Sequence, residues 1–271
     1  MEDSETVSGA KDKDSASGSG KAIEVVDLGV GYDDRPVLEH VSFSVEYNEI
    51  FIILGGSGCG KTTLLKHMIG LLQPWYGDIL VKGRSIVGSA GAEKREIMRS
   101  FGVLYQSGAL FGSLTVGENI ALPLEEHTPL SREMIAAVVE DKLALVGLNG
   151  FKDYMPSALS GGMRKRAGLA RAMALNPDIL FFDEPSAGLD PVSAAQLDRL
   201  ILNIRAELGT TMVIVTHELD SVFAIADRVM MLDKNKRGIT AEGKPETLRR
   251  RPADPWVKEF MTRSGLERKT C

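Results

Sequence analysis

A glycine-rich segment ends in a lysine and a threonine, a combination that can hold the phosphates of a nucleotide. Its spacing matches the pattern G-x-x-x-x-G-K-[ST] in full. The glycines let the backbone approach an anion closely, and the N–H groups that open the following helix point toward it. The segment therefore predicts a phosphate-binding loop made of Gly55, Gly56, Ser57, Gly58, Cys59, Gly60, Lys61 and Thr62.

The polar side chains at the end of this loop suit different parts of ATP. Lys61 is expected to neutralise the β- and γ-phosphates, and the Thr62 hydroxyl to bind Mg²⁺. Thr63 is placed for the α-phosphate. The alternative is a glycine turn with a chance lysine. A strand pattern precedes the loop and a helical pattern follows it at residues 62–69, and that context favours the phosphate site.

Two adjacent carboxylates follow an apolar run farther along the chain. Asp183 and Glu184 come directly after residues 179–182, which have the length and composition of a buried strand. Asp183 suits Mg²⁺, directly or through water, and Glu184 suits polarising an attacking water molecule. Because Pro185 follows, the pair alone also fits the start of a helix. Downstream of a phosphate loop in the same sheet, it predicts nucleotide hydrolysis.

The elements around these residues alternate between strand and helix. Strand patterns cover residues 23–28, 41–45, 50–54, 179–182 and 211–215, and helical patterns cover residues 132–145, 161–175 and 192–207. This alternation predicts an α/β fold with a mainly parallel sheet wrapped by helices. Ligands of such sheets gather at the carboxyl ends of the strands. We therefore expect the phosphate loop and the two carboxylates to meet at one sheet edge.

Composition divides the chain into segments. Residues 1–20 are rich in Ser, Gly and charged residues and are expected to be a disordered tail. Residues 21–243 are expected to form one ATPase domain, with an inserted helical subdomain at about residues 86–175. A C-terminal extension follows at residues 244–271. Its Trp256 and Phe260 are expected either to dock a partner or to pack on the domain itself.

Charge and hydropathy exclude several classes of protein. With 32 basic and 37 acidic residues the net charge is −5, which lacks the basic footprint of a nucleic-acid-binding protein. No apolar run approaches the roughly 18 residues of a membrane span, and the N-terminus shows no apolar signal core. We therefore expect a cytoplasmic protein with no nucleic-acid partner. Its cysteines, Cys59 and Cys271, lack metal-ligand spacing, and no disulfide is expected in a reducing cytosol.

A further motif relates the chain to a known family. The sequence LSGGM at residues 159–163 precedes a helical stretch that carries Arg164, Lys165, Arg166 and Arg171. It resembles the signature sequence of ATP-binding cassette (ABC) proteins, and it places a second anion site at a helix N-terminus. The resemblance implies that Ser160, Gly161 and Gly162 cap the γ-phosphate of ATP held by an opposing subunit. It therefore implies a homodimer of ATPase subunits.

The other elements of the ABC pattern follow in order. The resemblance implies that Tyr32 stacks on adenine, and that Gln106 contacts Mg²⁺ and water and senses a membrane partner. It also implies that residues 186–190 lie across the dimer seam and that His217 touches the γ-phosphate. Alone, Tyr32 fits a surface aromatic and His217 a core histidine. Over residues 23–243 the resemblance implies a P-loop NTPase fold with an antiparallel β subdomain, and ATP and Mg²⁺ as cofactors.

Met163 departs from the ABC pattern, which most often has Gln there. Together with GVLYQSGALF at residues 102–111 and ENIALPL at residues 118–124, it resembles the ATPases of Mce-type lipid transporters such as the Mla phospholipid system. This resemblance implies a peripheral motor at the cytoplasmic face of the bacterial inner membrane. Its implied partners are an integral-membrane permease, an Mce-domain lipid-binding protein and a STAS-domain protein. The alternative is an importer motor for polar solutes such as amino acids, since the membrane subunit selects the substrate.

Cys59 lies inside the phosphate loop, and two hypotheses about its thiol are open. The positive end of the following helix and the neighbouring Lys61 ammonium are expected to lower the pKa of the thiol and make it reactive. Alternatively, Cys59 is a small inert residue selected for its size. If the thiol is reactive, a maleimide is expected to inactivate the protein, and bound Mg-ATP is expected to slow that labelling.

Overall fold

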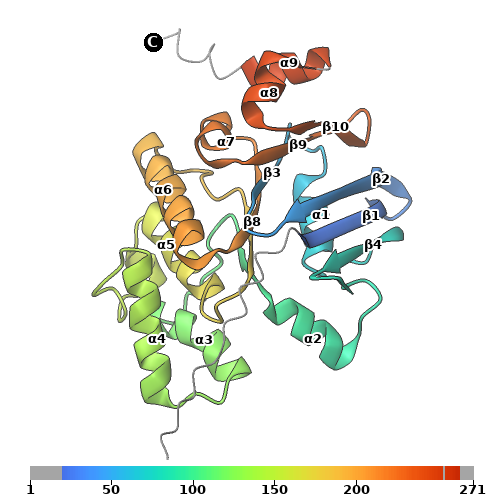
Figure 1. The fold of residues 1–271 in the computed structure, drawn as a ribbon. Coiled ribbons are helices and arrows are strands. Elements are labelled where there is room, and N and C mark those ends of the chain that lie inside the picture. The colour runs from blue at the N-terminus through green and yellow to red at the C-terminus, as the bar shows by residue number, and fades with distance from the viewer. Residues whose placement is uncertain (1–19, 253, 263–271) are drawn as a thin grey trace, which may run out of the picture.

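The computed structural model describes residues 20–252 and 254–262 of the chain. The expected tail at residues 1–20 lies almost entirely outside the described residues, and so does Cys271. The larger of two β-sheets lies between the smaller sheet on one side and a group of helices on the other (Figure 1). None of the described helices is both long and apolar enough to cross a membrane.

The larger sheet is the frame of the site. Its strand order is β10-β9-β3-β8-β7-β6. The strands are β3 (Ile50–Gly55), β6 (Phe101–Leu104), β7 (Ile179–Asp183), β8 (Thr211–Thr216), β9 (Arg228–Asp233) and β10 (Gly238–Gly243). The strands from β9 to β6 are parallel, and β10 is antiparallel at the edge. Every residue of β3 and β8 is buried, as expected for central parallel strands covered on both faces.

The smaller sheet is antiparallel and has the order β2-β1-β4-β5. Its strands are β1 (Lys21–Tyr32), β2 (Arg35–Glu46), β4 (Tyr76–Val81) and β5 (Arg84–Ser85). Their apolar side chains form one core with Phe51 and Ile53 of β3 and with helix α1 (Lys61–Met68). This sheet is the predicted antiparallel β subdomain, and it covers the side of the phosphate loop where α1 begins.

The opposite face of the larger sheet carries most of the other helices. Because side chains alternate along a strand, Ile52 and Leu54 face a second core, which is formed with α5 (Gly161–Ala172), α6 (Pro191–Leu208) and α7 (Leu219–Ile225). The sheet is thus wrapped on both faces. The α/β prediction with a mainly parallel sheet is confirmed.

The helical subdomain is smaller than the sequence suggested. Helices α3 (Val116–His127), α4 (Arg132–Leu145) and α5 pack on one another. By contrast α2 (Gly91–Arg99) packs against β6, and β6 pairs with β7 in the larger sheet. The expected helical subdomain at about residues 86–175 is therefore interrupted, because residues 101–104 belong to the larger sheet.

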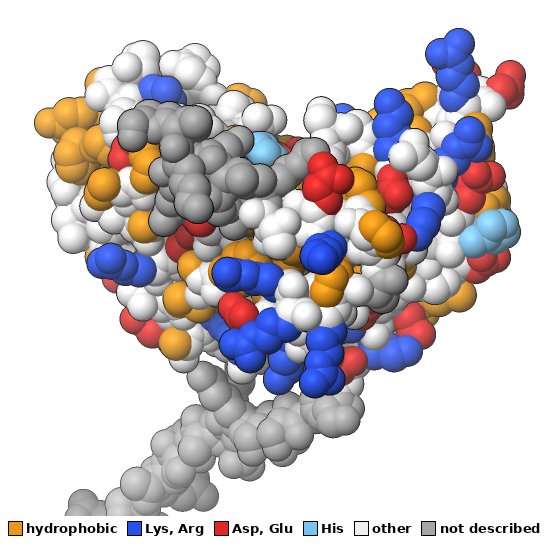
Figure 2. All heavy atoms as spheres, turned by 90° about the horizontal axis from the view of Figure 1, so that it is seen from above, with side chains coloured by type: hydrophobic (Ala, Val, Ile, Leu, Met, Phe, Trp, Pro, Cys, Tyr) orange, Lys and Arg blue, Asp and Glu red, His pale blue; other side chains and the backbone are white. Residues whose placement is uncertain are grey.

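The C-terminal helices pack on their own domain. Val257 and Met261 of α9 (Pro255–Thr262) are buried in the second core, and Trp256 and Phe260 pack against it. Helix α8 (Pro245–Arg250) precedes them and places the Arg249 guanidinium 5.2 Å from the centre of the Phe223 ring. Seen from the side where α8 and α9 lie, basic side chains gather along one edge of the molecule (Figure 2).

Candidate nucleotide site

The carboxyl ends of the parallel strands bring the predicted site residues to one edge of the larger sheet. The phosphate loop follows β3, and the carboxylates Asp183 and Glu184 stand at the end of β7. His217 follows β8, and Gln106 follows β6 in an exposed turn. Since β3, β8, β7 and β6 are neighbours in that order, the strand-end prediction is confirmed.

Glycine is required at the end of the phosphate loop by both conformation and space. Gly58 and Gly60 have φ angles of 73° and 103°, in the left-handed region that side chains rarely adopt. A Cβ on Gly60 would also lie 2.9 Å from Cγ1 of Val37. Gly60 caps α1 without a side-chain hydrogen bond. The first N–H groups of this helix are therefore oriented for an anion.

Lys61 is held over the loop by the loop's own backbone. Its ammonium donates to the carbonyls of Gly55, at 2.9 Å, and Gly56, at 3.3 Å. Its Nζ also lies 3.7 Å from Oε1 of Glu184. Lys61 is buried, so its charge is little screened by water. The positive charge therefore stands between the loop and the carboxylate at the end of β7.

The Glu184 carboxylate lies between the side chains of Lys61 and His217. Its Oε2 lies 2.9 Å from Nδ1 of His217, which donates to the carboxylate in the tautomer protonated at that nitrogen. Only 11% of the Glu184 side chain is exposed, against 54% for His217. The imidazole therefore reaches out toward solvent while the carboxylate is oriented at the base of the site. Such a carboxylate can accept a proton from a water molecule placed beside it.

The oxygen atoms at the start of α1 and the end of β7 fit Mg²⁺. The Thr62 hydroxyl donates to Oδ1 of Asp183 at 3.1 Å. Burial raises the pKa of the Asp183 carboxyl, and the hydrogen bond from Thr62 opposes that shift. Mg²⁺ prefers one or two such oxygen ligands with water and phosphate completing its shell. Within the described residues no cluster of three or more His, Cys, Asp or Glu offers an all-protein metal site.

Tyr32 lies beside the loop from the β subdomain. Its hydroxyl is 3.3 Å from Oγ1 of Thr63, the residue assigned to the α-phosphate. The side chain stays 48% exposed. An aromatic ring that is anchored at its hydroxyl and open on its surface is suited to stacking on a nucleobase.

The signature residues Ser160, Gly161 and Gly162 form the N-terminal end of helix α5. Ser160 caps the helix, and its side chain accepts from the N–H of Met163 at 3.2 Å. A Cβ on Gly161 would lie 3.7 Å from Leu189, and one on Gly162 would lie 3.7 Å from Ser193. The signature therefore packs beside the segment 186–193. The Met163 side chain is partly buried and packs on the second core, which accounts for an apolar residue there.

The structure corrects the hypothesis of a reactive Cys59. The residue is only 2% exposed, and its thiol packs in the core shared with the β subdomain. Burial raises the pKa of the Cys59 thiol above its ordinary value, although the Lys61 charge opposes this shift. Desolvation of the thiolate outweighs the local positive charge. Cys59 is therefore the small buried residue of the alternative hypothesis.

Two residues without an assigned role hold the loop that contains Gln106. Arg171 of α5 donates to the carbonyl of Ala109 at 2.7 Å. Asn119 of α3 is fully buried, and its side chain accepts from the N–H of Phe111 at 2.8 Å and donates to the same residue's carbonyl at 3.1 Å. Sequence patterns missed these roles because the partners are backbone atoms, which leave no signature in residue types.

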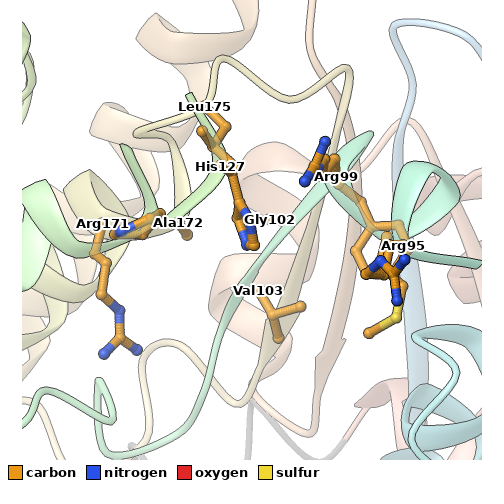
Figure 3. Close-up of a pocket in the computed structure, with 11 residues that line it drawn as sticks. Arg95, Arg99, Gly102, Val103, His127, Arg171, Ala172 and Leu175 are labelled. Atoms are coloured by element: carbon orange, nitrogen blue, oxygen red, sulfur yellow. The ribbon is translucent and has the colours of Figure 1, made fainter. Parts of the chain in front are cut away.

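A cavity of about 420 Å³ lies beside this loop. It is bounded by α2, β6, α3 and α5. Figure 3 shows Arg95 and Arg99 on one side of β6 and Arg171 on the other, with His127 between them. Apolar side chains complete the wall, and none of the described residues that line it carries a carboxylate. The cavity is therefore cationic, and through Arg171 it contacts the loop of Gln106.

Comparison with known proteins decides the family. The pattern of the family described as "ABC transporter" matches residues 38–187, more than half of the chain. This chain belongs to the ABC transporter family. Among its ABC relatives, the "Intermembrane phospholipid transport system ATP-binding protein MlaF" of Escherichia coli is 39% identical over 239 residues, 88% of each chain. The protein of that name from Haemophilus influenzae is 42% identical over 83% of this chain and 85% of its own.

Other ABC relatives differ in length. The "Probable ribonucleotide transport ATP-binding protein mkl" of Mycobacterium tuberculosis is 45% identical over 79% of this chain, which spans 59% of that protein's length.

Solved ABC structures agree with the fold. The cbiO1 subunit from Clostridium perfringens matches with a TM-score of 0.77 at 26% identity, covering 92% of this chain and 96% of its own. The dimeric cassette MJ0796, bound to ADP and Pi, matches at 0.75 and 27%, covering 82% and 98%.

Proposed function

We propose that this chain is the ATP-hydrolysing motor subunit of an ABC transporter that moves phospholipid between bacterial membranes. The placement of Glu184 is the observation that carries hydrolysis. Its carboxylate is held 2.9 Å from Nδ1 of His217 and 3.7 Å from Nζ of Lys61. It stands next to Asp183, the residue paired with the Thr62 hydroxyl. A phosphate loop, two oxygen ligands and a positioned base are the parts that phosphoryl transfer requires.

The residues of the site then divide the tasks of hydrolysis among them. The N–H groups of the loop and Lys61 bind the β- and γ-phosphates, and Tyr32 stacks on adenine. Thr62 and Asp183 hold Mg²⁺, with Gln106 as a further ligand, and Mg²⁺ supplies charge neutralisation of the phosphates. Glu184 orients the attacking water and takes its proton. His217 keeps the carboxylate in place and contacts the γ-phosphate.

A second copy of the chain completes the site. Ser160, Gly161 and Gly162 form a helix N-terminus that packs beside residues 186–193. Such a helix end binds anions, and an isologous dimer would place it on the partner's γ-phosphate. The dimeric cassette with bound ADP and Pi, which covers 82% of this chain, supports this assembly.

The substrate is proposed to be phospholipid because relatives named for intermembrane phospholipid transport align along 88% of both chains. The second candidate is a polar solute, and the relatives named for ribonucleotide transport favour it. An Mce-domain protein and a STAS-domain protein are further proposed partners for the phospholipid function. The chain would lie peripherally at the cytoplasmic face of the bacterial inner membrane.

The integral-membrane permease is proposed to contact the cationic cavity beside β6. Arg171 lines this cavity and also holds the carbonyl of Ala109. Gln106 belongs to the same loop. A permease segment that binds in the cavity would therefore shift the position of Gln106, the proposed Mg²⁺ ligand. Acidic side chains on that segment would complement Arg95 and Arg99.

Purification of the tagged chain from membranes tests the choice of substrate. We expect a permease and an Mce-domain protein to co-purify, and the complex to transfer phospholipid between vesicles only with Mg-ATP. Peptide mass analysis identifies the partners, and fluorescent phospholipid reports the transfer. A complex that instead contains a periplasmic solute-binding protein, and moves no lipid, would support the polar-solute function.

A further inference from the structure

A buried lysine of the signature helix reaches the backbone of the catalytic segment. Lys165 lies in α5, one turn after the Ser160 cap, and is 6% exposed. Its ammonium donates to the carbonyl of Ala187 at 2.7 Å and to the carbonyl of Glu184 at 3.1 Å. A buried ammonium needs such acceptors, because it has lost the water that solvated it. The two carbonyls and the lysine therefore constrain one another.

The backbone that Lys165 holds is unusual. Glu184 has a φ of 49°, in the left-handed region that a residue with a side chain seldom adopts. Its N–H donates to the carbonyl of Val215 at 2.8 Å, and its carbonyl also accepts from the N–H of Ala187 at 3.2 Å. This conformation sets the direction in which the side chain leaves the sheet. It persists only where surrounding contacts enforce it.

We propose that Lys165 is a positioning residue for ATP hydrolysis, which fixes the turn at residues 184–187 so that the Glu184 carboxylate faces His217 and Lys61. The proposal rests on the hydrolytic function proposed above. Lys165 and Ser160 belong to the same helix. The two hydrogen bonds of Lys165 therefore also connect the segment of the catalytic carboxylate to the surface that meets the second chain. A shift of α5 on dimer closure would thus reach Glu184 through two hydrogen bonds.

The charge environment of Lys165 agrees with a role that it performs through hydrogen bonds. Burial lowers the pKa of the Lys165 ammonium, and the Glu184 charge opposes that shift. Within the described residues the hydrogen bonds of the lysine go to the carbonyls of Glu184 and Ala187. Its role is therefore to hold the backbone rather than to neutralise a carboxylate.

Lys165→Met removes the donors while it keeps most of the length of the side chain. We expect kcat for ATP to fall about tenfold or more, with KM for ATP nearly unchanged, since small misplacement of a catalytic group costs up to about a hundredfold. Lys165→Arg retains buried donors and should recover most of kcat. Lys142→Met is the matched control, because Lys142 is a buried lysine of α4 that bonds the Asn176 side chain. It should retain the kcat of the unmodified chain.

A double-mutant cycle separates positioning from general support of the fold. If Lys165 acts through Glu184, Lys165→Met should add little further loss in a Glu184→Gln background, measured by single turnover. Equal losses in both backgrounds would overturn the proposal. So would a Lys165→Met enzyme whose kcat equals that of the Lys142→Met control. Should Lys165→Met fail to fold, Lys165→Leu, which also lacks donors, carries the same comparison.

Failure of this inference is distinct from failure of the proposed function. The unmodified chain and the Lys142→Met control report whether ATP is hydrolysed at all. If both hydrolyse ATP and Lys165→Met does so equally well, only the positioning role is lost. If neither hydrolyses ATP with its membrane partners present, the proposed function itself is wrong, and the positioning role falls with it.

Discussion

Replacing Glu184 with glutamine is expected to lower the rate of ATP hydrolysis by roughly 10²–10⁴-fold while ATP still binds, because an amide cannot take a proton from water. The amide keeps the shape of the side chain, and its oxygen can still accept a hydrogen bond from Nδ1 of His217. In the unmodified chain this nitrogen lies 2.9 Å from the carboxylate. With Mg-ATP the variant is expected to stay dimeric, since in the proposed cycle hydrolysis separates the two chains. Turnover, nucleotide binding and oligomeric state measure these effects.

Asp178→Asn is the matched control for Glu184→Gln. Asp178 precedes the same strand, β7, at the end away from the phosphate loop, and its carboxylate pairs with Lys82 at the surface. Exposed ion pairs contribute about 1 kcal/mol or less, so the control should retain normal turnover. If Glu184→Gln hydrolyses ATP at a rate near that of Asp178→Asn, Glu184 is not the group that activates water.

Lys61→Ala is expected to weaken nucleotide binding and to reduce hydrolysis by at least roughly a hundredfold, because it removes a preorganised charge from the phosphate site. The fold should survive, since the φ angles of Gly58 and Gly60 and the packing of Gly60 against Val37 do not depend on this side chain. Nucleotide titration, turnover and thermal unfolding test the three parts of this expectation.

Lys82→Ala serves as the control for Lys61→Ala, because Lys82 is a lysine of the β subdomain surface whose partner is Asp178. Its affinity for ATP and its turnover should match those of the unmodified chain. A Lys61→Ala chain that hydrolyses ATP at the normal rate would rule out the phosphate-loop assignment. A chain that unfolds at a much lower temperature than the control would show that Lys61 supports the fold instead.

The sequence predicted the parts of the site that rest on local patterns. The runs at residues 50–54, 179–182 and 211–215 are apolar enough to identify buried strands, and parallel strands place their ends together. The phosphate loop is a contiguous motif, so its geometry followed from its residue types. His217 and Glu184 are 33 positions apart. Their hydrogen bond was not predicted, because it depends on β7 and β8 being neighbours.

Features that depend on packing were missed or misjudged. Strand β6 has only four residues, and Gly102 within it gave no strand signal. The glycine is needed because a Cβ there would lie 2.0 Å from the carbonyl oxygen of Ala172 in α5. For Cys59 the sequence showed the nearby charge but not the β subdomain that buries the thiol. The partners of Lys165 are backbone carbonyls, which no residue pattern reveals.

Hydrolysis by a mixture of two inactive variants tests the two-chain site most directly. Lys61→Ala keeps an intact signature, and Ser160→Arg keeps an intact phosphate loop but blocks closure over the phosphate loop of the partner chain. A mixed dimer therefore contains one complete site, formed by the loop of one chain and the signature of the other. A two-chain site predicts that each variant alone is inactive and that the equal mixture regains about a quarter of normal turnover if chains pair at random and sites act independently. A mixture that forms mixed dimers yet stays as inactive as its components would contradict it.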